Sequence, residues 1–137
     1  MSSENVALVR SIIRAWNDRG DPSVEAYHDD AEWDFEGWAF DLQGTFHGTE
    51  GLSEMLDALR SEWEEIRVDE EQYLEAGDKV AFVGRFSARR RSSGLEVSDS
   101  GTCIFTIRDG RVARFSLVHD RERAMQLLGN EAQTVPR

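Results

Sequence analysis

The second half of the chain carries apolar residues at a period of two, and this alternation constrains the fold more than any other feature of the sequence. A strand turns successive side chains to opposite faces of a sheet, so the period predicts strands with one face toward a core. Four such segments follow one another, at Ile66–Ala76, Val80–Arg91, Leu95–Arg108 and Val112–His119. The dipeptide Asp109-Gly110 is typical of a two-residue type I′ turn, so we predict a run of antiparallel hairpins.

The first half of the chain predicts helices around one short strand. Residues Glu4–Arg19 place apolar side chains at helical spacing, a second short helix is expected after the N-cap Asp21, and a third begins near Thr49. Between the second and third helices, Glu32–Glu36 alternates as a strand does. We therefore predict an α+β domain with helices on one face of a curved sheet.

The C-terminal segment predicts one more helix and then a tail. Asp120 is a suitable N-cap and Gly129 a suitable C-cap for the intervening helix. The length of 137 residues suits one domain, which we expect over residues 1–129, with a flexible polar tail at 130–137.

The composition limits the partners. The chain has 27 acidic and 16 basic residues and a formal net charge of -11, so we expect no nucleic acid and no membrane as partners. The basic run "ARRRSSG", residues 88–94, allows a local nucleic-acid site, but a solvated hairpin tip accounts for it better. The single cysteine, Cys103, excludes an internal disulfide, and three histidines without ligand spacing predict no metal. No cofactor is expected.

The N-terminus and the use of arginine suggest a bacterial cytoplasmic protein. The stretch "MSSENVALVRSIIRAW" does not resemble a signal peptide, and no segment approaches the ~20 apolar residues that cross a bilayer. Arginine outnumbers lysine by fifteen to one, which is typical of a GC-rich bacterial genome.

Five stretches carry a resemblance to a known superfamily. They are "AWNDRGDPSVEAYHDDAEWDFEG", "FHGTEGLSEML", "GDKVAF", "FTIRDGRVARFSL" and "HDRERAMQLLG", over roughly residues 6–129. In their order and spacing the chain resembles the SnoaL-like group of the nuclear transport factor 2-like superfamily, which includes the ketosteroid isomerases. The resemblance implies an α+β fold with a cone-shaped, curved antiparallel sheet and three N-terminal helices packed on its concave face. It also implies a deep pocket between sheet and helices, and commonly a homodimer. It implies no single activity, since this scaffold carries isomerases, cyclases, epoxide hydrolases, dehydratases and non-enzymatic modules.

Asp34 is the first candidate catalytic residue. In "EWDFEG" it stands where ketosteroid isomerases, by this resemblance, keep their general base, while their two oxyanion donors fall on Ile12 and Cys103. One such donor is worth ~100- to 1000-fold in rate, so steroid isomerisation is not expected. A carboxyl group in an aromatic pocket would have a raised pKa, as a general base needs. The alternation allows the opposite arrangement, with Trp33 and Phe35 inward and Asp34 facing water.

Two other activities of the superfamily fit in part. Limonene epoxide hydrolases use two acids and an arginine; Arg85 matches the arginine, but Ser87 and Leu117 fall where the acids belong, so this chemistry is not expected. SnoaL-type polyketide cyclases use an acid near the last strand. Asp120 lies in that neighbourhood, and a helix cap is the competing explanation for it.

Arg114 interrupts an otherwise apolar strand. A two-residue turn would place Phe105 opposite Arg114 and Cys103 opposite Ser116, on one face. Because the resemblance puts Cys103 in the pocket, we expect the other three side chains there too. Arg114 would then pair with an acid such as Asp34, or hold an anionic group of a substrate.

The remaining candidates are ligand-binding residues. Large rings with few polar groups suit a flat hydrophobic ligand. We expect the pocket wall to include Trp16, Tyr27, Trp38, Phe46 and Trp63. His47 precedes the third helix, at an expected pocket rim, with a solvent-facing loop position as the alternative. His119, beside Asp120, is a further candidate acid or base.

Two functions are compatible with these residues. The first is cofactor-free acid/base chemistry, of isomerase or polyketide cyclase type, on a small hydrophobic carbonyl compound, with Asp34, Arg114 and Asp120 as catalytic residues. The alternative is a non-catalytic small-molecule-binding or dimeric interaction module. A homodimer is predicted because an apolar outer sheet face needs a cover. That face is expected to consist of Ile104, Thr106, Phe115 and Leu117.

Overall fold

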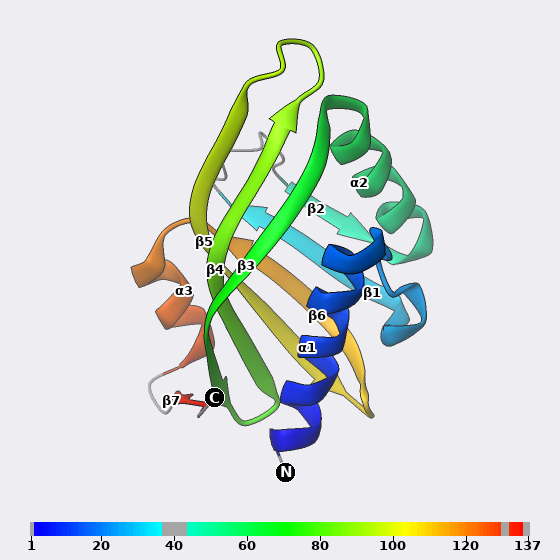
Figure 1. Ribbon diagram of the computed structural model, residues 1–137. Coiled ribbons are helices and arrows are strands. Elements are labelled where there is room, and N and C mark those ends of the chain that lie inside the picture. Colours follow the sequence, from blue (N-terminus) through cyan, green and yellow to red (C-terminus); the bar gives the residue numbers. More distant parts are fainter. Residues whose placement is uncertain (1, 37–43, 130–131, 136–137) are drawn as a thin grey trace.

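The computed structural model describes residues 2–36, 44–129 and 132–135, and Figure 1 shows how its elements are arranged. The helices are α1 (Ser2–Arg19), η1 (Val24–Ala26, a 3-10 turn), α2 (Gly48–Glu62) and α3 (Arg121–Leu128). The strands are β1 (Tyr27–Glu36), β2 (Gly44–His47), β3 (Trp63–Ala76), β4 (Lys79–Arg90), β5 (Glu96–Arg108), β6 (Arg111–Val118) and β7 (Gln133–Thr134). They form one seven-stranded sheet in the order β2-β1-β6-β5-β4-β3-β7.

The four long strands predicted from the alternation are confirmed as β3 to β6, each antiparallel to the next. Asp109 and Gly110 both have positive φ, 53° and 77°, as a type I′ turn requires. One pairing departs from the expected antiparallel sheet, because β1 lies parallel to β6. These strands are far apart in the chain, and a long connection permits a parallel pair where a hairpin does not.

The helices divide between the two faces of the sheet. α1 and α2 cover the concave face, where Val9 and Leu52 join the main core, and α3 packs on the opposite face, where Ala124 contacts a second apolar cluster with Ile104. The α+β class, the curved sheet and the three helices before the long strands are confirmed, and the second of these helices is the short 3-10 helix η1. Ser23 has a left-handed φ of 57°, which interrupts the predicted second helix and leaves only the short turn η1 before β1.

The hairpin of β5 and β6 contains a bulge that the sequence did not reveal. Val112 lies opposite Ile107, but the register then shifts, so Phe105 lies opposite Phe115 and not opposite Arg114. The shift leaves Ala113 as the extra residue of β6. One inserted residue moves every following side chain of the strand to the other face of the sheet.

The bulge reverses the predicted facing of the second half of β6. Phe115 and Leu117 belong to the core beneath α1 and α2, and Leu117 lies opposite Cys103. Arg114 and Ser116 therefore face the other side, so the predicted register is wrong there. The outer apolar patch expected from the sequence is also not assembled, because two of its members point inward and Ile104 is covered by α3.

The end of the chain is partly built into the sheet. Gln133 and Thr134, in the segment expected to be a flexible tail, pair with β3 as the short strand β7. Within the described ranges, no helix combines the length and the apolar character needed to span a bilayer.

Candidate functional site: an apolar cavity and its mouth

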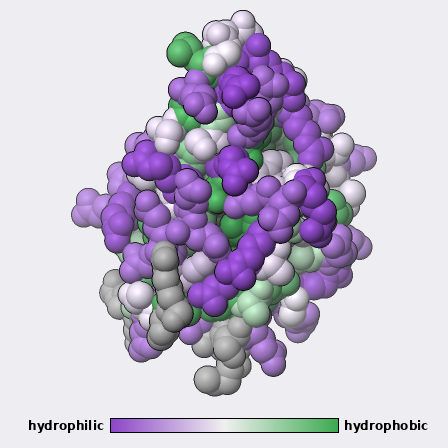
Figure 2. Space-filling view, viewed as in Figure 1, coloured by the Kyte–Doolittle hydropathy of each residue, from purple (hydrophilic) through white to green (hydrophobic). Residues whose placement is uncertain are grey.

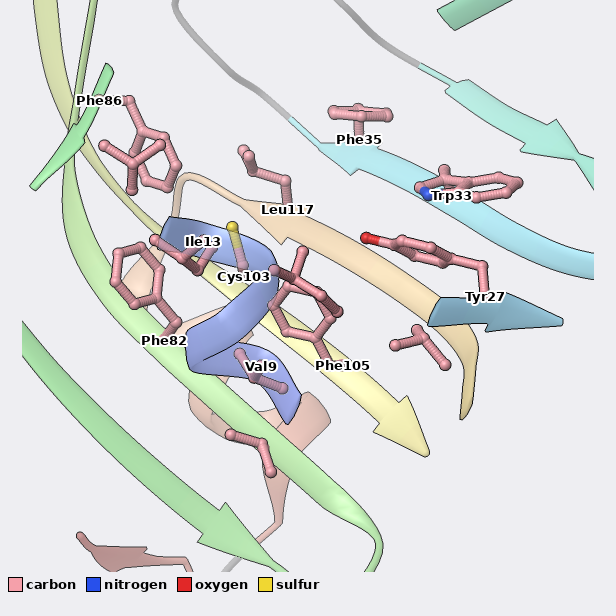
Figure 3. Packing of buried hydrophobic residues seen from close by; sticks show 14 of the residues in the cluster. Val9, Ile13, Tyr27, Trp33, Phe35, Phe82, Phe86, Cys103, Phe105 and Leu117 are labelled. Carbon is pink, nitrogen blue, oxygen red and sulfur yellow. The ribbon is translucent and has the colours of Figure 1, made fainter. Parts of the chain in front are cut away.

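An apolar cavity of about 130 Å³ lies inside the cone, between the concave face of the sheet and helices α1 and α2. Its wall consists of Ile12, Ile13, Trp16, Asp21, Pro22, Tyr27, Trp33, Phe35, Leu52, Met55, Leu56, Leu59, Ile66, Val68, Phe86, Cys103, Phe105, Phe115 and Leu117. Figure 3 shows part of this core, with side chains from α1 and several strands pointing toward one another. An engineered apolar cavity of ~150 Å³ binds benzene, so this one admits a group about the size of a single ring.

Tyr27 supplies a neutral hydroxyl to the cavity wall. Burial raises the pKa of this phenol, and nearby Cys103 adds to the rise. The ring of Trp33 packs beside that of Tyr27, with 5.2 Å between the ring centroids. Because its pKa is raised, the phenol keeps its proton at neutral pH. In Figure 3 the hydroxyl points toward the interior, so it can donate a hydrogen bond to a carbonyl oxygen of a bound molecule.

Cys103 is an inert part of the wall. Its side chain is buried, and burial raises the pKa of the thiol. A protonated thiol is a poor nucleophile, so Cys103 contributes apolar surface and space to the cavity.

Asp34 lies on the side of β1 that faces away from the cavity. The residues on either side of it, Trp33 and Phe35, line the cavity, and strand geometry turns Asp34 outward. The Asp34 carboxylate pairs with Arg114, whose Nη1 also donates to Glu32 at 3.1 Å. The sequence allowed this pairing of Arg114 with Asp34, but the pair lies outside the cavity.

The outward acids of β1 form a charged row that we call the acidic ladder, defined as Asp30, Glu32, Asp34 and Glu36. Each of them has an arginine partner. Arg108 is 3.4 Å from Asp30, and Arg123 is 3.3 Å from Glu36. Arg114 forms ion pairs with both Glu32 and Asp34. On β2, the Thr45 hydroxyl donates to Asp34 at 2.7 Å. The acids of the opening strand thus make ion pairs on its outer side and leave the inner side apolar.

The predicted acid/base histidines lie on the surface. His47 Nδ1 is 3.0 Å from Glu32, at the ladder, and His119 Nε2 is 2.8 Å from Asp99. Asp120 is the N-cap of α3 and accepts the backbone N–H of Glu122 at 2.9 Å and of the next residue at 3.2 Å. Among the residues that the structure describes, no group of three or more metal-ligating side chains comes together.

The predicted ligand-binding residues divide between the cavity and other places. Trp16, Tyr27, Cys103 and Phe105 line the cavity. Phe46 packs edge-on against Phe35, with 5.9 Å between ring centroids, and Ser116 is buried on the opposite face of β6. Trp38 lies outside the described residues. Trp63 is buried beside a second hollow, and the guanidinium of Arg90 lies 4.3 Å over its ring.

That second hollow, which we call the mouth groove, measures about 640 Å³ and lies where the C-terminal ends of α1 and α2 meet the start of β3. It is lined by Trp16, Asn17, Asp18, Arg19, Gly20, Arg60, Trp63, Glu64, Glu65, Ile66, Arg67 and Arg91. Trp16 and Ile66 line both hollows, and Trp16 Nε1 donates to the Ile66 carbonyl at 3.1 Å. Figure 2 shows hydrophobic residues in the depressions of a mostly hydrophilic face. The groove therefore adjoins the cavity, and Trp16 and Ile66 form their common wall.

The sequence did not predict the mouth groove, and of the cavity wall it predicted only Trp16, Tyr27, Cys103 and Phe105 as ligand-binding residues. The groove combines helix ends with a bulged strand start, and residues so far apart in the chain show no shared pattern. Phe115 and Leu117 were assigned to the outer face because nothing in the local sequence marks Ala113 as a bulge.

Comparison with known proteins agrees with this architecture. The model of a family described as SnoaL-like domain matches residues 9–115. Among solved structures, an NTF2-like protein of unknown function from Burkholderia pseudomallei K96243 is 18% identical, with a TM-score of 0.75, and the match covers 93% of this chain and 98% of that chain. No curated protein matches the sequence.

Two further solved structures have the same fold. A putative polyketide cyclase from Xanthomonas campestris pv. campestris is 14% identical, with a TM-score of 0.73 and coverage of 93% of this chain and 98% of that one. A protein with a ketosteroid isomerase-like fold from Catenulispora acidiphila DSM 44928, in complex with trimethylamine, is 13% identical, with a TM-score of 0.70 and coverage of 89% and 92%. The family match spans most of the chain and the fold agrees with it, so this protein belongs to the SnoaL-like domain family.

Proposed function

We propose that the protein binds a small hydrophobic molecule whose ring enters the cavity and whose carbonyl or similar acceptor meets the Tyr27 hydroxyl. The observation that carries this proposal is a buried apolar cavity with a neutral hydrogen-bond donor in its wall. Apolar walls with a few placed polar groups are typical of small-molecule sites. The trimethylamine complex of the structural neighbour from Catenulispora acidiphila supports small-molecule binding on this fold.

Ligand binding alone fits the geometry better than acid/base catalysis with Asp34 as the base. A general base must come within hydrogen-bond reach of the proton it removes, and Asp34 is held by Arg114 and Thr45 on the outer side of β1. Catalysis of isomerase or cyclase type, with Asp34, Arg114 and Asp120 as catalytic residues, stays a prediction. Its support is the family resemblance and the neighbour described as a putative polyketide cyclase.

A pair of ring compounds of equal size tests the proposal. Acetophenone carries a carbonyl and cumene does not, and both can be titrated by calorimetry or by chemical-shift perturbation. We expect both to bind, with acetophenone binding more tightly by a few-fold to tenfold, since a neutral hydrogen bond contributes ~1 kcal/mol. Tyr27→Phe should remove this preference and leave cumene binding intact.

Filling the cavity provides the matched control. Cys103→Leu adds side-chain volume inside the cavity, so we expect both compounds to lose affinity while the protein stays folded by circular dichroism. Failure of both compounds to bind at millimolar concentration would contradict the proposal, as would binding that Cys103→Leu leaves unchanged.

Homodimerisation and a cytoplasmic location also stay predictions. The only large hydrophobic side chains exposed among the described residues are Val24 and Leu95, so a homodimer would need a mainly polar interface. Light scattering at micromolar concentration tests this, and a monomer would contradict it.

A further inference from the structure

We infer that the mouth groove is a binding site for an anionic group of the same ligand, held by Arg60, with the charge of Arg67 adding to the positive potential of the groove. The ligand class is then an amphipathic acid, such as an aryl-substituted carboxylate, with its ring in the cavity and its carboxylate at the mouth. This inference rests on the proposed function, since it extends the cavity site outward.

The sizes of the two hollows are the first argument. The cavity of about 130 Å³ accommodates one ring, whereas the groove of about 640 Å³ is several times larger. Because Trp16 and Ile66 belong to both walls, the groove adjoins the cavity, and a molecule longer than one ring can extend past these two residues into the groove. The part of such a ligand that leaves the cavity is therefore in contact with the groove residues.

The charges of the groove are the second argument. Within the groove, Arg91 pairs with Glu64 at 3.4 Å. Two other charged groove residues pair with residues outside the groove: Glu65 with Arg89 at 2.8 Å, and Arg19 with Asp21 at 3.2 Å. Asp21 is also the one carboxylate of the cavity wall within the described residues, so its pairing removes a charge that would repel an anion at the mouth.

Arg60 and Arg67 take part in none of these pairs, and among the described groove residues only Asp18 opposes them. After pairing, the groove thus keeps an excess of positive charge, although the whole chain has a net charge of -11. A local charge opposite in sign to that of the molecule marks a place where an anion gains attraction that the rest of the surface does not offer.

The position of Arg60 is the third argument. Its guanidinium lies 5.7 Å from the centroid of the Trp16 ring, and Trp16 forms part of the cavity wall. Arg60 Nη2 donates to the Gly20 carbonyl at 3.1 Å, which fixes the side chain across the end of α1. A guanidinium has five N–H donors, so donors remain for a carboxylate. Arg60 therefore stands at the junction of cavity and groove.

The test uses two probes of equal shape that differ in charge. 3-Phenylpropanoate and 3-phenylpropanamide have the same ring and chain, and the chain is long enough to bring the terminal group out of the cavity. Their dissociation constants are measured by calorimetry near neutral pH, at about 50 mM and about 500 mM salt. We expect the carboxylate to bind about tenfold more tightly than the amide at low salt, because hydrogen bonds to a charged group are the strong ones. The preference should shrink at high salt, since the groove is open to solvent.

Arg60→Gln and Arg67→Gln should each reduce the preference for the carboxylate and leave the affinity for the amide unchanged, which also shows that the cavity is intact. Arg85→Gln is the matched control, because Arg85 is an exposed arginine of β4 that donates a hydrogen bond to Ser98 at 3.1 Å, outside the groove. It should change neither affinity.

The outcomes separate this inference from the proposed function. If both probes bind equally, or if the preference persists in both arginine variants, the anionic site is overturned and the cavity site stands. If Arg85→Gln lowers the preference as much as Arg60→Gln does, the effect is one of overall charge, and the inference is overturned as well. If neither probe binds, the cavity proposal and this inference are both overturned.

Discussion

The two sides of β1 carry opposite chemistry within one short strand. On the inner side, Trp33 and Phe35 are buried in the cavity wall, while on the outer side Glu32 and Asp34 pair with Arg114. Successive residues thus serve an apolar binding site and a hydrated ion-pair row. The ion pairs on the outer side account for the acidic residues of β1. A carboxylate next to aromatic residues in the sequence therefore need not lie next to them in space, because successive side chains of a strand point to opposite faces.

The bulge in β6 separates these two sides in the neighbouring strand. It keeps Phe115 inside and Arg114 outside, and without it the order would be reversed. We expect deletion of Ala113 to have the largest effect of the changes considered, because it would drive Arg114 into the apolar cavity or break the pairing of β6 with β1. A buried charge without its partner costs ~3–5 kcal/mol, which is a large part of the stability of a small domain.

Urea denaturation followed by circular dichroism measures this loss. Ala113→Gly is the matched control, since it keeps the inserted residue, and it should cost no more than ~1 kcal/mol. A deletion variant as stable as the wild type would mean that the strand tolerates either register, and the proposed separation of the two sides would be wrong.

The burial of Tyr27 on the inner side of β1 should make the stability of the protein depend on pH above pH ~10. Burial raises the pKa of Tyr27, so the folded protein keeps a proton that the unfolded chain releases near pH ~10. Above that pH the unfolded state binds fewer protons than the native state, so the free energy of unfolding falls as pH rises. The slope for one such group is about 1.4 kcal/mol per pH unit.

Denaturation curves between about pH 8 and pH 11 test this expectation. Tyr27→Phe removes one titrating group, so its stability should fall less steeply than that of the wild type by about that slope. Tyr73 also has a pKa raised by burial, and by its hydrogen bond to Glu70, so some decline should remain in the variant. Equal slopes in the two proteins would show that Tyr27 ionises as easily in the fold as in the unfolded chain.

The sequence predicted the scaffold better than the site. Period-two alternation and the Asp109-Gly110 turn were sufficient for the four long strands, because both signals are local and strong. Tyr27, Trp16 and Cys103, which were expected on a pocket wall, line the cavity, and their contact with a ligand stays a prediction. These residues lie on elements whose inward face is fixed before any bulge intervenes.

What could not be predicted depends on single irregular residues. The bulge at Ala113 changes the facing of the five residues that follow it in β6, and the left-handed Ser23 reduces the predicted second helix to a 3-10 turn before a longer strand. Alanine and serine also occur within the regular helices and strands of this chain, so neither residue marks an irregularity in the sequence. The mouth groove depends on helix ends and on the start of β3, where Glu65 has a positive φ of 55°. Such sites arise from tertiary packing and leave no periodic signal.

The outer side should respond weakly to the loss of a charge, which sharpens the contrast with the inner side. Arg114 is about half exposed, and Glu32 is one-third exposed, so their pairing at 3.1 Å is screened by water. In a double-mutant cycle of Arg114→Gln and Glu32→Gln, we expect a coupling energy of ~0.2–1 kcal/mol at low salt. Salt at about 1 M should reduce it, because the Debye length then shrinks to ~3 Å. A coupling of several kcal/mol that resists salt would show that the ladder is a desolvated network, and the acids of β1 would again need a role beyond pairing with arginines at the surface.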